Sequence, residues 1–304
     1  MRSRAALLTS LLITSASAVL IAPGCGSSDD ASLNNGGDGG IPGDENPGGN
    51  IDGGPGGDGG RPCTTGLCTQ QVNCPSGQDT TVSGVVYDPA GRVPLYNVLV
   101  YVPNAPVAAI PTGASCDRCD GSLYSGDPLT GVQTDAAGRF KIPKMPVGKD
   151  IPLVIQLGKW RRQITIPAVT ACVDTPLTDK NQTRLPRKQS EGNIPLIAIT
   201  TGGADTMECL PLRMGIDISE FSTKGGTGRV HLYKGDDLID PNNSNNNVYA
   251  TGQFSPEVAG GAAFKKSTEV WSNTDQLKAY DMVILSCEGT QNPGSKPVTS
   301  RQAL

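Results

Sequence analysis

Apolar and polar residues alternate with a period of two through much of the segment 80–177. Within it Val98, Val100 and Val102 share one face of an extended strand, whereas Leu99 and Tyr101 share the other. Turn sequences rich in Gly, Pro and Asp, such as 88–91 and 135–138, separate the alternating runs. The expected strands cover 81–87, 98–102, 129–134, 139–142, 151–157 and 161–166. Six or seven short strands with regular turns predict a β-sandwich.

The pattern changes after a polar segment, 178–193, which reads as a linker. Apolar runs become continuous and alternate with short helical stretches, which is typical of an α/β layer with a parallel sheet. The expected elements are strands at 194–200, 230–233 and 282–286 and helices at 206–214 and 272–280. Three strands are too few to complete such a sheet. We therefore expect residues 194–304 to form a partial α/β domain and the sequence to be a truncated fragment.

The first 24 residues predict a signal peptide. Two arginines in the first four residues precede an apolar run at 5–21, and small residues follow before Cys25. The run is rich in Ser, Thr and Ala, and it is too short for a membrane-spanning helix of about 20 apolar residues. The arrangement resembles a bacterial lipoprotein signal with Cys25 as the lipidated first residue, although Ala22 stands where lipoboxes usually carry Leu. The alternative is an ordinary secretion signal with Cys25 unmodified.

Residues 25–61 read as a low-complexity tether. Between 26 and 60 there are 14 glycines and seven acidic residues, with no Lys or Arg. Such a segment buries too little apolar surface to offset the entropy of ordering, so we expect it to stay disordered. A Gly-rich coil of this length reaches about 33 Å. The sequence thus predicts an exported protein held by a lipid anchor at the cell envelope, with the outer membrane favoured, or secreted if Cys25 is unmodified.

Eight cysteines follow Cys25, and an even number in an exported chain predicts disulfides. The candidates are Cys63, Cys68, Cys74, Cys116, Cys119, Cys172, Cys209 and Cys287. The first three lie in a Cys-rich knob at 62–79, and we considered a bond between Cys209 and Cys287. Cys116 and Cys119 have the C-x-x-C spacing of zinc and redox sites. With one histidine in the chain and no second C-x-x-C, we expect a structural disulfide there, no metal and no cofactor.

Several runs in 80–177 resemble the carboxypeptidase regulatory-like domain. They are 82–88, Gly91, 98–100, the T-D-x-x-G-x-F element at 134–140, and 146–148. The resemblance implies a seven-stranded, prealbumin-like (transthyretin-like) β-sandwich of the carbohydrate-binding-like fold, which the family shares with Cna B-type repeats. It also implies no catalysis in this domain, since the family accompanies a zinc peptidase. We expect Asp135 and Gly138 to form a turn that sends Phe140 into the core.

Relatives with this fold bind sugars on loops or exposed aromatic surfaces. By this resemblance the candidate ligand contacts are Trp160, Tyr101, Tyr124 and Arg161, with Arg162 beside them. The alternative is that Trp160 packs on the sandwich and that the arginines form a solvated edge.

The run 277–285 is similar to the early half of amidotransferase-like α/β domains. Cys287 follows the last expected strand, as a thiol nucleophile does, but a nucleophile needs a nearby base and His231 is the only imidazole. Gly202 and Gly203 precede a helix without the G-x-G-x-x-G or G-K-[ST] pattern of a phosphate loop. We therefore predict no catalytic residues.

Net charge is −4 and no Lys/Arg cluster stands out, which argues against a nucleic-acid partner. The sequence favours a non-catalytic cell-envelope lipoprotein, mainly β, whose sandwich is a scaffold or recognition module. Its expected partners are the membrane through the anchor and either a polysaccharide or another envelope protein. The alternative is an envelope enzyme with its chemistry in the incomplete α/β part.

Overall fold

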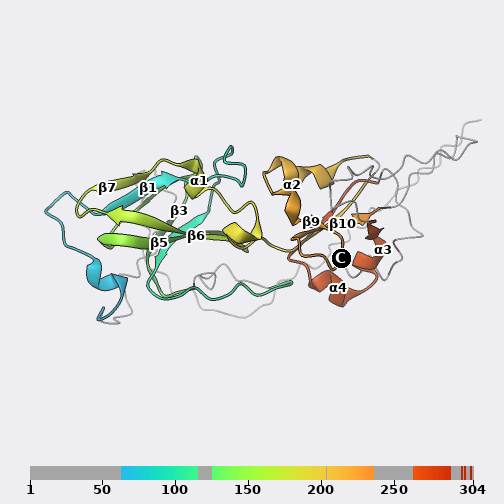
Figure 1. Cartoon of the computed structure of the whole chain (residues 1–304), viewed down its shortest axis with the longest axis horizontal. Coiled ribbons are helices and arrows are strands. Elements are labelled where there is room, and N and C mark those ends of the chain that lie inside the picture. Colours follow the sequence, from blue (N-terminus) through green and yellow to red (C-terminus); the bar gives the residue numbers. More distant parts are fainter. Residues whose placement is uncertain are drawn as a thin grey trace, which may run out of the picture. The chain divides into compact units, whose positions relative to one another are not determined.

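The computed structural model describes residues 63–115, 125–202, 204–235 and 263–288, with positions 296, 298 and 302 (Figure 1). The chain divides into two compact units, 1–45 and 46–304, and every described residue belongs to the second. The predicted signal peptide, Cys25 and the tether lie outside the described residues, as do Cys116, Cys119 and Tyr124. In the described part, no helix is long and apolar enough to cross a bilayer.

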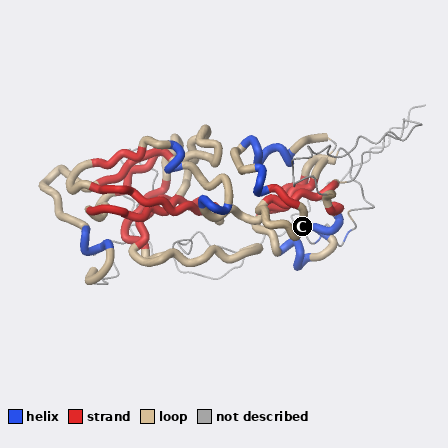
Figure 2. Tube along the Cα trace, viewed as in Figure 1, coloured by secondary structure: helices blue, strands red, loops and turns tan. Residues whose placement is uncertain are grey.

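Two sheets form the first part of the described chain, and Figure 2 shows their strands in red. The four-stranded sheet has the order β3-β2-β5-β6, and the three-stranded sheet has the order β4-β1-β7. The strands are β1 (Thr81–Val85), β2 (Leu99–Pro103), β3 (Pro128–Gln133), β4 (Arg139–Ile142), β5 (Gly148–Leu157), β6 (Trp160–Val169) and β7 (Asp174–Leu177). All neighbours are antiparallel except β1 and β7. The chain is mainly β and sandwich-like, as predicted, whereas its relation to the prealbumin-like fold stays a prediction.

The period-two pattern places alternate side chains between the sheets. Val100 and Val102 of β2 join Leu153 and Ile155 of β5 in one dry, fully buried cluster. Each such side chain contributes about 1.5–3 kcal/mol when it leaves water. Tyr101 points to the other face, where Val107 of the following loop packs on it. The four-stranded sheet is therefore covered on both faces.

The turn expected at 135–138 is formed. The Oδ1 atom of Asp135 accepts hydrogen bonds from the backbone N–H of Ala137 and of Arg139, both at 2.8 Å. Gly138 has φ 73°, and a Cβ there would lie 2.8 Å from the Cβ of Pro94, so the position requires glycine. Phe140 enters the core two residues later and is buried.

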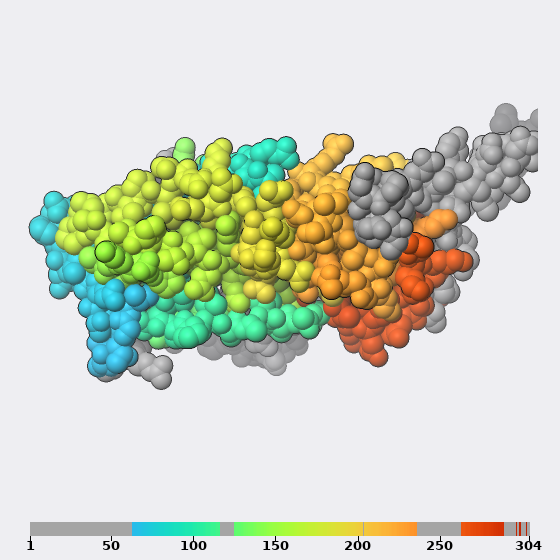
Figure 3. All heavy atoms as spheres, in the orientation of Figure 1, coloured from blue at the N-terminus to red at the C-terminus, as the bar shows by residue number. Residues whose placement is uncertain are grey.

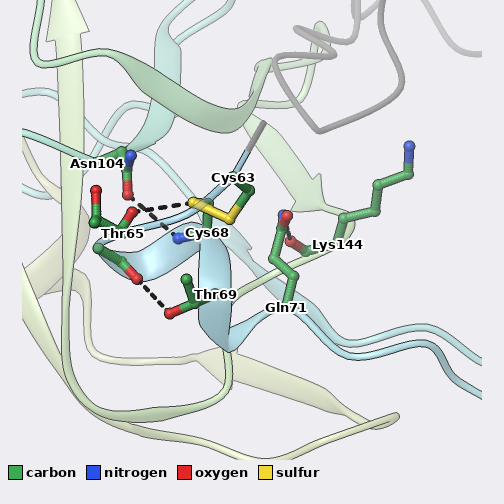
Figure 4. Close-up of a disulfide and its surroundings, with 8 residues drawn as sticks. Cys63, Thr65, Cys68, Thr69, Gln71, Asn104 and Lys144 are labelled. Carbon is green, nitrogen blue, oxygen red and sulfur yellow. Dashed lines mark hydrogen bonds between the residues drawn. A yellow bond between two sulfur atoms is a disulfide. The ribbon is translucent and has the colours of Figure 1, made fainter. Parts of the chain in front are cut away.

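Two disulfides join the described cysteines, Cys63–Cys68 and Cys74–Cys172. The first lies at the 3₁₀ turn η1 (Leu67–Gln70), where the backbone N–H of Cys68 donates to Oδ1 of Asn104 at 3.2 Å (Figure 4). The second ties the segment before β1 to the segment before β7, 98 residues further on. The bond considered between Cys209 and Cys287 is absent, because both thiols are free.

A third sheet, the parallel sheet, follows with the order β11-β10-β8-β12, and β9 also pairs with β10. All of its pairs are parallel, as the continuous apolar runs predicted. Its strands are β8 (Ile197–Thr200), β9 (Phe221–Ser222), β10 (Val230–Lys234), β11 (Lys265–Lys266) and β12 (Met282–Leu285). Its helices are η3 (Met207–Cys209), α2 (Leu210–Arg213), η4 (Ile218–Glu220), α3 (Thr268–Trp271) and α4 (Thr274–Lys278).

Helices cover both faces of this sheet, and Figure 1 shows α2 on one side and α3 and α4 on the other. Ile197, Ile199 and Leu232 share a buried cluster with the region of α2. Ala198 and Tyr233 instead pack with α3. Among the described residues β12 is a sheet edge, and Met282 and Leu285 are 42% and 44% exposed.

The segment predicted as a linker is closely packed. It contains α1 (Lys180–Thr183) and η2 (Gln189–Glu191), and Figure 3 shows it in yellow among close-packed atoms. The guanidinium of buried Arg184 donates to both carboxylate oxygens of Glu191, at 2.7 and 2.9 Å. These bonds lower the pKa of Glu191 to about 2. Its polar composition therefore hid a hydrogen-bonded segment, whose polar groups have partners both inside the stretch and beyond it, as in the bonds from Gln189 to Glu220 and from Arg187 to the Gly215 carbonyl.

Candidate ligand-binding groove

The predicted ligand contacts that the structure describes, Tyr101, Trp160 and Arg161, are buried. Tyr101 is fully buried, and Trp160 and Arg161 are only 9% and 8% exposed. The Tyr101 hydroxyl donates to the Ser125 carbonyl at 3.1 Å, and the Arg161 guanidinium donates to the Ala108 carbonyl at 2.8 Å. These side chains hold a loop onto the four-stranded sheet. Burial thus favours the packing alternative for Trp160, while Arg161 is enclosed instead of lying on a solvated edge.

An open cavity lies on the three-stranded sheet instead. Its volume is about 570 Å³, and its walls come from β1, β4, β7, the end of β3 and α1. We call it the sandwich groove and define it by its principal side chains, which are Ser83, Val85, Tyr87, Arg139, Lys141 and Pro176. This size falls within the range of small-molecule sites in proteins.

Strand register explains why these side chains converge. Ser83 of β1 lies opposite Lys141 of β4 and Pro176 of β7, and Val85 lies opposite Arg139. Directly paired residues project to the same face of a sheet. Ser83 and Val85 are half-buried and Arg139 and Lys141 are exposed, so no layer of protein covers this face within the described part of the chain.

The carboxylates near the groove already have partners. Oδ1 of Asp135 is bonded within its own turn. Asp174 accepts hydrogen bonds from the hydroxyl groups of Thr81 at 2.5 Å and Ser83 at 2.6 Å. By contrast, the cationic groups of Arg139 and Lys141 make no hydrogen bond or ion pair with any described residue.

Sequence reasoning missed these residues. The usable signal was the alternation of β4, in which Phe140 and Ile142 point inward and Arg139 and Lys141 therefore point outward. The sequence predicts Tyr87 only as part of a strand. In the structure Tyr87 lines the groove, and the centroid of its ring lies 4.8 Å from Nζ of Lys180 in α1. That cation adds a third positive charge beside the groove.

A second arrangement lies at the carboxyl ends of β8 and β12. The chain leaves β8 toward β10 on one side and returns to β12 on the other, which makes this the switch point where α/β proteins bind ligands. The N–H of Cys287 donates to Oδ2 of Asp205 at 2.9 Å, and the N–H of Ala204 donates to the Cys287 carbonyl at 3.0 Å. A Cβ at Gly202 would lie 2.2 Å from that carbonyl oxygen, so only glycine fits.

No imidazole lies near this thiol. His231 pairs in register with Ala198, which is four residue steps before the level of Cys287, or about 13 Å along the strands. Its ring is buried, with Nδ1 2.8 Å from the Tyr280 hydroxyl, and burial lowers the pKa of His231. Burial also raises the pKa of Glu208, with a further contribution from Asp205. The described residues contain no group of three or more His, Cys, Asp or Glu side chains placed to hold a metal ion.

No family model and no curated protein matches the chain. Among solved structures it is similar to two mutants of a type II cohesin–X-dockerin complex from Acetivibrio cellulolyticus. The N-terminal interface mutant is 17% identical, with 45% of this chain and 85% of that chain covered and a TM-score of 0.23. The C-terminal interface mutant is 16% identical, with the same coverage and a TM-score of 0.24.

The third similar structure is catechol 1,2-dioxygenase from Acinetobacter sp. ADP1, inhibited by bound mercury. It is 11% identical, with 41% of this chain and 58% of that chain covered and a TM-score of 0.23. Likenesses of this size carry no statement about what this chain binds. The resemblances to lipoproteins and to the carboxypeptidase regulatory-like domain stay predictions.

Proposed function

We propose that this protein is a non-catalytic recognition or scaffold module of the cell envelope, and that its sandwich groove binds the partner. The observation that carries this proposal is the open cavity of about 570 Å³ on an uncovered sheet face. Polar and cationic side chains beside apolar walls suit recognition of a hydrophilic partner such as a polysaccharide or another envelope protein. The disulfide between Cys74 and Cys172 supports an oxidising compartment.

The binding experiment fills the groove with a large side chain. Val85→Trp projects a bulky ring from the end of β1 into the groove, whereas Thr165→Trp places the same ring on an exposed position of β6 in the other sheet of the sandwich. Both variants and the parent protein are tested on a glycan array and on extracts of envelope proteins. We expect Val85→Trp alone to lose the bound partner. Equal binding by both variants would contradict the assignment of the groove.

The proposed localisation at the cell envelope rests on the N-terminal sequence. We propose export and lipidation at Cys25, with residues 25–61 as the tether. Metabolic labelling with a palmitate analogue should mark the parent protein and leave a Cys25→Ala variant unlabelled. A parent protein that takes up no label, and that is recovered from the medium, would support simple secretion instead.

A second candidate function is an enzyme that uses Cys287 at the switch point. The free, exposed thiol of Cys287, a residue whose backbone N–H is bonded to Asp205, is the observation that favours it. An activated nucleophile is present as thiolate at lower pH than an ordinary cysteine. The rate of alkylation by iodoacetamide, measured against pH in Cys209→Ser, reports Cys287 alone among the described free thiols. A profile like that of a free cysteine would remove this candidate.

A further inference from the structure

We infer that the sandwich groove binds an anionic saccharide, a sugar chain that carries carboxylate or sulfate groups. This inference rests on the proposed function, because it names the class of ligand for the same groove. It starts from the two cations of β4, Arg139 and Lys141, which project from one face of the strand and have no partner among the described residues.

The charge of the groove is unbalanced toward positive. Arg139 and Lys141 stand two residues apart on one strand, so their Cα atoms are roughly 7 Å from each other on the same face. Among the described residues that line the groove the acidic one is Asp135, whose Oδ1 accepts from two backbone N–H groups, and the neighbouring Asp174 accepts from Thr81 and Ser83. Two separate cations that make no hydrogen bond or ion pair with any described residue suit a ligand that carries anionic groups along its length.

An acidic peptide that adds as a further strand fits this site less well. Such a peptide needs free backbone groups on the edge of β4. At Arg139 both are occupied, since its N–H donates to Oδ1 of Asp135 at 2.8 Å and its carbonyl accepts from the Asp135 N–H at 2.9 Å. The ligand therefore lies on the face of the sheet, where side chains make the contacts.

The neutral walls of the groove match sugar hydroxyl groups. Gln133, Thr178 and Thr183 line it together with Tyr87, and each has a side chain that can donate or accept a hydrogen bond. Val85 and Pro176 supply apolar contact between these polar groups. The polar side chains can therefore bond sugar hydroxyl groups, the apolar ones can contact the sugar ring, and the cations can pair with its acidic substituent.

The test measures binding of the mature chain to polygalacturonate, neutral dextran and poly-glutamate at low and at physiological salt. Arg139→Gln/Lys141→Gln removes the groove cations. Lys149→Gln/Lys188→Gln removes two exposed cations outside the groove and is the matched control. We expect binding to polygalacturonate that weakens with salt, falls at least tenfold in the groove variant and is unchanged in the control. Thermal melting of each variant verifies that it is folded.

The other outcomes separate this inference from the proposed function. Dextran bound as tightly as polygalacturonate, with no effect of the groove variant, would overturn the anionic assignment and leave the recognition module standing. Tighter binding to poly-glutamate would overturn the saccharide in favour of an acidic peptide. Loss of polygalacturonate binding in both variants would show non-specific attraction to positive charge. Binding to no glycan and no envelope protein would end both proposals.

Discussion

The sandwich and the parallel sheet of the described chain are stabilised in part by different means. The sandwich has an aliphatic interior and a disulfide that closes a long loop between Cys74 and Cys172. The parallel sheet shares that aliphatic cluster through Ile197, Ile199 and Leu232, and it adds a buried polar network, with the hydroxyls of Tyr233 and Tyr280 2.5 Å apart and the Tyr280 hydroxyl 2.8 Å from His231. The sandwich should therefore respond to redox conditions and the parallel sheet to pH.

The two tryptophans of the chain allow the unfolding of each part to be followed separately, because Trp160 lies in β6 of the sandwich and Trp271 lies in α3 beside the parallel sheet. Fluorescence of Trp271→Phe reports the sandwich, and fluorescence of Trp160→Phe reports the parallel sheet. A single shared transition under every condition would show that the sandwich and the parallel sheet unfold as one cooperative unit.

The largest expected effect is loss of the long-range disulfide. Cys74→Ala/Cys172→Ala should lower the free energy of unfolding seen by Trp160 by about 4–5 kcal/mol, because the bond closes a loop of 98 residues. Cys63→Ala/Cys68→Ala is the matched control, and its loop of five residues predicts a loss of about 2 kcal/mol. Urea denaturation measures both. Equal losses would show that loop length does not set the contribution of these bonds.

The next effect comes from a buried ion pair. Asp281 accepts from Nζ of Lys159 at 2.7 Å and from the N–H of Leu196 at 2.6 Å, and its side chain is almost fully buried. Asp281→Ala leaves the Lys159 ammonium, which also donates to the Gly113 carbonyl, and the Arg229 guanidinium without their carboxylate, and it should cost about 3 kcal/mol in urea denaturation. Asp281→Asn keeps a hydrogen-bond acceptor and should cost less. Similar values for the two variants would place the contribution in packing instead of charge.

A smaller effect is a pH dependence of the free energy of unfolding, which we expect in the parallel sheet because of His231. Burial, then the charges of Arg229 and Lys224, lower the pKa of His231 below its usual 6.5 in the folded chain. The neutral imidazole therefore contributes stability above pH 6.5, and this contribution is lost as pH falls through the lowered pKa. Chemical denaturation monitored at Trp271 should show falling stability below pH 6.5, and the parent's slope should be reduced in His231→Gln. An unchanged slope would assign the pH dependence to carboxylates.

Tyr280→Phe tests the same buried network without changing charge. It removes the hydroxyl that contacts both His231 and Tyr233, which leaves buried polar atoms unpaired and should cost about 1–3 kcal/mol. Tyr96→Phe, at an exposed position, is the matched control and should be neutral. A neutral Tyr280→Phe would mean that water replaces the lost contact.

The smallest effect is expected at the groove. Arg139→Gln/Lys141→Gln should change the free energy of unfolding by less than about 0.5 kcal/mol, because both side chains are exposed and lack partners in the described part of the chain. Thermal or urea denaturation checks this. A loss above 1 kcal/mol would show that the cations stabilise the fold and would weaken their assignment to binding.

The sequence by itself determined where most strands begin and end, because period-two alternation and turns such as 135–138 are local properties. It also determined that the sheet of the α/β part is parallel, since β12 is apolar at every position and β8 is apolar at every position before Thr200. Only the tertiary structure decided which cysteines pair, that Trp160 and Arg161 are buried, and that Arg139 and Lys141 share an uncovered groove wall. Those facts depend on which residues meet across the fold, and a linear pattern records the face of each side chain without recording what covers that face.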